Sequence, residues 1–155
     1  MVKLEAFERS PKMSELKVTY RRNKKTTGGT LYQAADAEKY LRSVWNRDMI
    51  DFVEEFLMVC LNNAHQPFGW VKVASRGFSA TPVDPRVVFS IALQTASSAL
   101  LVAHNHPSNN PEPSREDILA TQRLVKAGAV LGIKILDHII LTRDKSVSLC
   151  GRGLL

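Results

Sequence analysis

The sequence predicts an α/β fold, a three-layer sandwich in which a central mixed sheet lies between flanking helices. Two observations support this prediction. Short apolar runs, typical of buried strands, alternate along the chain with longer segments whose apolar residues recur at helical spacing. The 155 residues are 45% hydrophobic, and a chain of this size can bury most of its apolar surface in one domain. We therefore expect one core built around one sheet.

The first half of the chain is expected to supply a helix and several strands. Residues 33–46 repeat apolar side chains at helical spacing, which predicts an amphipathic helix. The apolar runs 54–61 and 69–74 are separated by a short turn that ends at Pro67, which predicts an antiparallel hairpin. Before them, residues 16–21 alternate apolar and polar side chains, as an edge strand does.

The second half begins with a clear helix start. Asp84 followed by Pro85 is typical of an N-cap and a first helical residue, and predicts a helix to about Thr95. Its inward-facing residues are expected to be Val88, Ala92 and Leu93. A further helix is expected from Ser114 to about Gly128. The remaining strands are expected at residues 98–103, 133–141 and 147–149.

Two histidines follow the apolar strand 98–103. Residues two apart on a strand project from the same side, so His104 and His106 point together while Asn105 faces away. Two neutral imidazoles at this spacing can bind one zinc ion if a third ligand and an open position complete the tetrahedron. Asp117 is the candidate third ligand, because it lies on the first turn of the helix that starts at Ser114.

Each of these residues also has a purely structural interpretation. Ser114 and Asp117 form a Ser-x-x-Asp pattern that resembles a capping box, in which the acid binds the helix's own amides. His104 and His106 could be hydrogen-bonded histidines at a sheet edge. Metal binding is favoured because the ligand types, the strand spacing and the downstream acid coincide.

The motif resembles a known family. The string His-Asn-His-Pro-Ser at 104–108, followed by Pro-Ser-Arg-Glu-Asp at 113–117, is similar to the signature of the JAMM (MPN-plus) metalloproteases and of their bacterial RadC branch. The similarity covers roughly residues 54–149. It implies a JAB/MPN fold, deaminase-like in architecture, over residues 31–155. It also implies a zinc site of His104, His106 and Asp117 and hydrolysis of an amide bond through a metal-activated water.

The resemblance also implies catalytic roles for two further side chains. A glutamate at the start of an upstream strand acts as general base, and here Glu54 and Glu55 are both candidates. The RadC pattern, a glutamate followed by an aromatic residue two positions on, fits Glu54 with Phe56 and favours Glu54. The alternative for either glutamate is a purely structural role as a solvent-exposed charge at the start of the strand. Ser114 is expected to donate a hydrogen bond to the oxyanion in addition to capping its helix.

Three other residues carry weaker expectations. His65 and His138 are expected to be structural, although a hydrogen bond from the Asp137–His138 pair to a metal ligand is an open alternative. Asn109 stands where RadC proteins usually have glycine. Asparagine tolerates the left-handed backbone region, so the loop is expected to keep its shape.

The net charge of +6 is concentrated at the amino terminus. Residues 1–30 hold eight Lys and Arg against three Glu, whereas residues 31–155 hold thirteen against twelve acids. The basic arm, 1–30, and above all Arg21–Lys25, could bind nucleic acid, although such a run is more often a solvated segment. The alternative function is therefore a DNA-repair or mobile-element accessory module with a structural or vestigial metal site. The RadC branch usually has a helix-hairpin-helix region before this domain, and here we expect only the basic arm and one helix, which counts against DNA contact.

The remaining expectations concern compartment and partners. Cys60 and Cys150 form no C-x-x-C pair, and no apolar run approaches the ~20 residues of a membrane helix, so we expect a cytoplasmic protein without membrane contact. The H-x-E and P-C-x-x-C elements of zinc deaminases are absent. The expected partner is a peptide or protein substrate, and the oligomeric state is left open.

Overall fold

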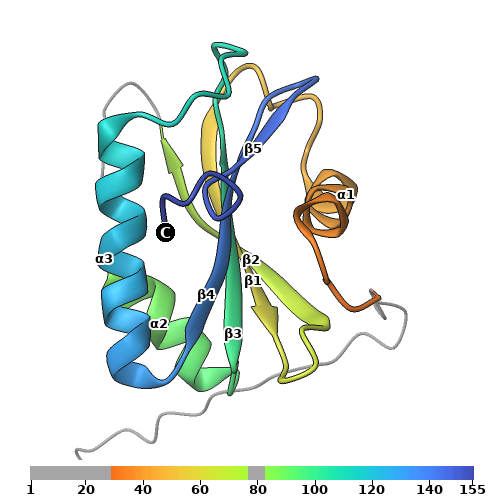
Figure 1. Cartoon of the computed structure of the whole chain (residues 1–155). Helices are drawn as coiled ribbons and strands as arrows, with labels where there is room; N and C mark the ends of the chain where they lie inside the picture. Colours follow the sequence, from red (N-terminus) through yellow and green to blue (C-terminus); the bar gives the residue numbers. More distant parts are fainter. Residues whose placement is uncertain (1–28, 77–82) are drawn as a thin grey trace, which may run out of the picture.

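The computed structural model, which describes residues 29–76 and 83–155, has the three predicted layers (Figure 1). A five-stranded sheet forms the middle layer, with α1 on one face and α2 and α3 on the other. The helices are α1 (Ala34–Val44), α2 (Pro85–Gln94) and α3 (Arg115–Leu131). The strands are β1 (Glu54–Leu61), β2 (Pro67–Arg76), β3 (Ala99–Asn105), β4 (Lys134–Leu141) and β5 (Ser146–Ser148).

The sheet is mixed, with the strand order β2-β1-β3-β4-β5. Neighbouring strands are antiparallel except β3 and β4, which are parallel and joined by the crossover helix α3. The loop after β3 therefore passes over the end of the sheet to the amino terminus of α3 (Figure 1). This connection places the end of β3 beside the first turn of α3.

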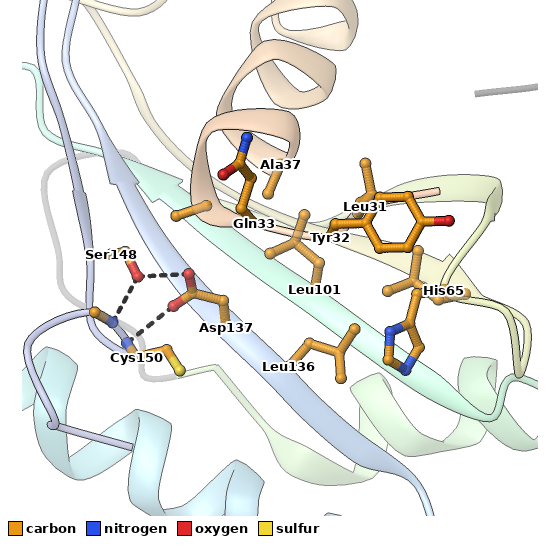
Figure 2. A pocket seen from close by; sticks show the side chains of 13 residues that line it. Leu31, Tyr32, Gln33, Ala37, His65, Leu101, Leu136, Asp137, Ser148 and Cys150 are labelled. Carbon is orange, nitrogen blue, oxygen red and sulfur yellow. Dashed lines mark hydrogen bonds between the residues drawn. The ribbon is translucent and has the colours of Figure 1, made fainter. Parts of the chain in front are cut away.

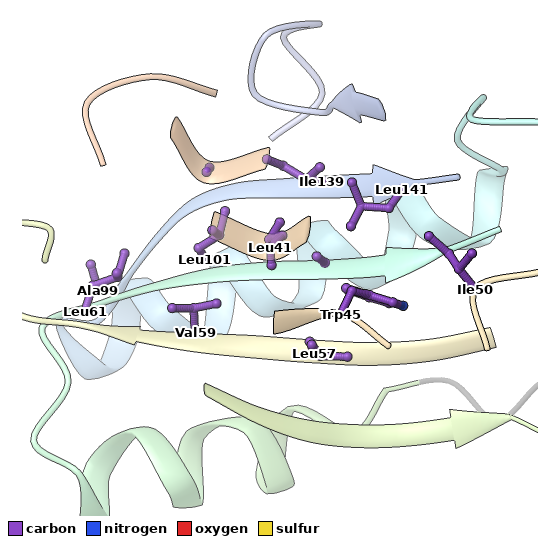
Figure 3. Packing of buried hydrophobic residues seen from close by; sticks show 12 residues of the cluster. Leu41, Trp45, Ile50, Leu57, Val59, Leu61, Ala99, Leu101, Ile139 and Leu141 are labelled. Carbon is purple, nitrogen blue, oxygen red and sulfur yellow. The ribbon is translucent and has the colours of Figure 1, made fainter. Parts of the chain in front are cut away.

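The two central strands, β1 and β3, are buried on both faces, and alternate residues along them enter different cores. Figure 3 shows the core under α1. That cluster comprises Ala37, Leu41, Trp45, Ile50, Leu57, Val59, Leu61, Ala99, Leu101, Ala103, Ile139 and Leu141. The core under α2 and α3 comprises Phe56, Met58, Cys60, Val83, Val88, Phe89, Ala92, Leu100, Val102, Leu124, Ile133 and Ile135. In β1 and β3, the odd-numbered residues thus face α1, and the even-numbered residues face α2 and α3.

Most predicted elements are present, with shifted ends. Asp84 caps α2 through its side chain, as predicted, but Leu93 is 56% exposed, and Phe89 occupies the core instead. Leu93 lies a further 100° around the helix from Ala92, which turns it to solvent. The predicted strand 16–21 and the basic arm 1–30, apart from its last two residues, lie outside the described residues. None of the described helices is long and apolar enough to cross a membrane.

Gly128 lies where α3 closely approaches its own connection to β4 and the side chain of Phe89 from α2. A Cβ atom built there would clash with the backbone carbonyl oxygen of Ile133, and it would lie 3.3 Å from the ring of Phe89. We expect Gly128→Ala to lower the free energy of unfolding by about 1–3 kcal/mol, although alanine is the better helix former. Urea denaturation would measure this. The exposed Val130→Ala should change it by less than about 0.5 kcal/mol, and an equal loss in both variants would contradict the explanation.

Candidate metal centre

The end of β3 carries the two histidines of the predicted site. His104 lies within the strand and pairs with Phe56 of β1, and His106 follows directly after Asn105. The backbone N–H of His106 donates to the carbonyl of Leu141 at the end of β4, at 2.8 Å. His104 is 2% exposed, whereas His106 is only partly buried. The strand therefore presents one buried imidazole and one that solvent can reach.

The first turn of α3 supplies the acid and the hydroxyl. Ser114 Oγ accepts a hydrogen bond from the backbone N–H of Asp117 at 3.1 Å. One carboxylate oxygen of Asp117 accepts from the Ser114 backbone N–H at 2.8 Å and from its hydroxyl at 2.6 Å. The capping box that the sequence suggested is thus present. In the preceding loop Asn109 has a φ of 59°, the left-handed conformation that asparagine tolerates.

His104, His106 and Asp117 come together at one point. The Nε2 atoms of His104 and His106 are 2.9 Å apart, and Nε2 of His104 lies 3.2 Å from one carboxylate oxygen of Asp117. Nε2 of His106 lies 3.4 Å from the other. Tetrahedral zinc would keep such ligand atoms roughly 3.3–3.6 Å apart, so this donor set fits the ion with small adjustments. Among the described residues, no other group of three His, Cys, Asp or Glu side chains is close enough to share a metal ion.

The charges in this cluster favour a cation. Burial raises the pKa of the Asp117 carboxyl, but hydrogen bonds with His104 and His106 outweigh burial and hold that pKa well below its usual range. The pKa of His106 is raised above its ordinary value, chiefly by the hydrogen bond with Asp117. Burial opposes this rise, and the negative charge of Glu54 adds to it. An ionised carboxylate beside two imidazoles is a donor set that suits a divalent ion.

The other ring nitrogen of each histidine also has a partner. Nδ1 of His106 lies 2.7 Å from the backbone oxygen of Asn110. Because a carbonyl can only accept, Nδ1 carries a proton, and Nε2 is the nitrogen that holds the lone pair when the ring is neutral. Nδ1 of His104 lies 2.8 Å from Nε2 of His138, which is 1% exposed. Burial, followed by the nearby charge of His104, lowers the pKa of His138 well below its ordinary value. The sequence left open whether His138 makes a hydrogen bond with a metal ligand, and the structure shows this contact, with His104.

The adjacent glutamates at the start of β1 belong to opposite faces of the sheet. Phe56 packs against the ring of His104, at 6.3 Å between centroids, so strand alternation puts Glu54 on that face and Glu55 on the face of α1. Glu55 is 4% exposed, and its carboxylate is paired with Lys72 of β2. The geometry thus separates the two candidates, and it puts Glu54, which the resemblance favoured, on the face of the metal cluster.

Asn105 faces away from the two histidines, as the sequence predicted, and has a role that the sequence did not indicate. Its side-chain amide donates to the carbonyls of Ile50 (2.6 Å) and Val53 (2.9 Å). Its side-chain oxygen accepts from the backbone N–H of Glu55 at 2.7 Å. Asn105 is fully buried, so no water replaces these bonds. They fix the backbone that leads into β1, and with it the position of Glu54.

A cavity of about 330 Å³ lies beside α1 (Figure 2). Its lining includes Leu61 and Leu101 of the core under α1, so it lies on the other face of the sheet from the metal cluster. The carboxylate of Asp137 lines it and accepts hydrogen bonds from the Ser148 hydroxyl (2.6 Å) and the backbone N–H of Cys150 (3.0 Å). His65 also lines it, from the exposed turn between β1 and β2, which agrees with a non-ligating role. Cys150 and the buried Cys60 are both free thiols.

Comparisons with known proteins agree with this geometry. A family model described as the RadC-like JAB domain matches residues 31–154, which includes α1 as well as the stretch that carries the motif. A UPF0758 protein of Listeria welshimeri is 44% identical over 102 residues, 66% of this chain and 46% of the relative. UPF0758 proteins of Desulforamulus reducens and Salinibacter ruber are 39% and 44% identical over the same length, 45% and 44% of each relative. The matched region thus spans about half the length of these curated relatives.

Proposed function

This chain belongs to the RadC-like JAB domain family, and on that premise we propose that it is a zinc-dependent hydrolase of peptide or isopeptide bonds. The observation that carries the proposal is the convergence of His104, His106 and Asp117, each presenting a donor atom to one point. Zinc bound there would polarise a carbonyl group and lower the pKa of a water molecule to about 7. Three protein ligands would leave the fourth position for water or substrate.

Glu54 is the proposed general base. It lies on the face of the metal cluster. Its negative charge raises the pKa of His106, although by less than Asp117 does. Its carboxylate would accept a proton from the attacking water and pass it to the leaving amine. Glu55 does not suit this role, because its carboxylate is buried against Lys72 on the other face.

Ser114 is the proposed oxyanion donor. Its hydroxyl donates to Asp117 in the structure and lies on the exposed side of the site, at the amino terminus of α3. A small rotation would let it donate to a substrate carbonyl oxygen as negative charge develops there. The helix amino terminus favours that charge as well. The proposed substrate is an amide bond in a peptide or protein chain, which can approach from the partly exposed side of His106.

Metal content per chain tests the proposal. We expect the purified protein to hold close to one zinc ion per chain and the double variant His104→Ala, His106→Ala to hold none. His65→Ala is the matched control, because this histidine lies on the other side of the sheet and should leave zinc content unchanged. Elemental analysis after gel filtration would measure all three. A wild-type chain that stays zinc-free when zinc is offered would contradict the proposal and would favour the alternative of a nucleic-acid-binding module.

A further inference from the structure

Three buried side-chain contacts connect the two halves of the metal cluster behind the ligands. The hydroxyl of Thr121 donates to the backbone carbonyl of Asp117 at 2.6 Å. The same hydroxyl oxygen lies 2.5 Å from Nδ1 of His138, and Nε2 of His138 lies 2.8 Å from Nδ1 of His104. Thr121, His138 and His104 are each at most 2% exposed. The chain of direct contacts thus runs from one proposed ligand residue, Asp117, to another, His104.

Counting protons along this chain leaves one arrangement. Thr121 has a single hydroxyl proton, which the carbonyl of Asp117 takes, so the hydroxyl oxygen must accept from Nδ1–H of His138. A neutral imidazole carries one ring proton, so Nε2 of His138 is an acceptor. Nδ1 of His104 must then be the donor, so Nε2 is the nitrogen of His104 that holds the lone pair when this ring is neutral.

We propose that Thr121 and His138 are positioning residues that hold His104 in the tautomer whose Nε2 can bind zinc; this inference rests on the proposed function. His106 needs no such device, because its partner is a carbonyl, which can only accept. The partner of His104 is another imidazole, which could either accept or donate. Thr121 removes that ambiguity, because it requires a donor at Nδ1 of His138.

Substituting Thr121 tests the inference through zinc affinity. Thr121→Val keeps the shape of the side chain and removes the hydroxyl, so His138 can present a proton to His104 and the wrong tautomer becomes accessible. We expect the zinc dissociation constant, measured by competition with a chromogenic chelator, to rise about 10–100-fold. Thr121→Ser keeps the hydroxyl and should bind zinc within about threefold of wild type. Equal affinity in the valine variant and wild type would overturn the proposal.

Nitrogen NMR of the histidine rings in zinc-free protein gives a readout that a merely structural role would not move. In wild type and in Thr121→Ser, His104 should show the pattern of a ring protonated at Nδ1, whereas Thr121→Val should show a mixture of tautomers. A neutral His104 ring protonated at Nε2 instead of Nδ1 in the wild type would overturn the inference. If no variant bound zinc, the proposed function would fail, but the ring spectra would still decide the tautomer of His104 either way.

Discussion

We expect Glu54→Gln to retain zinc and to lose amide hydrolysis by a factor of about 10²–10⁴. Glutamine has nearly the same shape as glutamate, but its amide cannot accept the proton of the attacking water. Zinc should remain, because the three converging donors belong to His104, His106 and Asp117. The measurement is turnover of a peptide or isopeptide substrate, found by screening with wild type, together with zinc content of the same preparation.

Glu55→Gln is the matched control for this experiment. Glu55 is the neighbouring residue, but it lies on the face of α1 and pairs with Lys72. Its substitution should lower stability and leave turnover within a few-fold of wild type. If Glu54→Gln were as active as wild type, or if Glu55→Gln lost activity to the same extent, the assignment of the base to Glu54 would be wrong.

The fold was predictable because local patterns suffice for its elements. The apolar run of β1 and the helix start at Asp84 and Pro85 are both signals within a few residues, and both elements are present. The strand order could not be predicted in the same way, because the pairing of β1 with β3 joins segments about 45 residues apart. Leu93 was wrongly predicted to face the core, because a pattern of apolar residues does not predict how far around a helix the buried face extends.

The site was predictable where its residues form a motif and was hidden where they do not. His104, His106 and Asp117 have spacings that reflect a strand and the first turn of a helix, and the structure brings them together. Thr121 was missed, although its place one turn after Asp117 on α3 was a usable signal. Asn105 was assigned its direction correctly, but its bonds to the segment before β1 depend on tertiary structure.

Loss of the Ser114 hydroxyl should lower both the rate of catalysis and the stability of α3. We expect Ser114→Ala to lower kcat by about 10²–10³, because a donor to the developing oxyanion contributes roughly 2.7–4 kcal/mol. The same substitution removes the cap of α3 and should lower the free energy of unfolding by about 0.5–2 kcal/mol. Steady-state kinetics and urea denaturation of one preparation would measure both effects.

Ser114→Gly distinguishes the two effects, because glycine is tolerated at an N-cap and costs only a few tenths of a kcal/mol relative to serine. It lacks the hydroxyl, so its kcat should fall as far as that of Ser114→Ala while its stability stays close to wild type. If turnover instead followed stability, with the glycine variant nearly as active as wild type, then Ser114 would serve the site only as the cap that orients Asp117. The oxyanion would then need another donor.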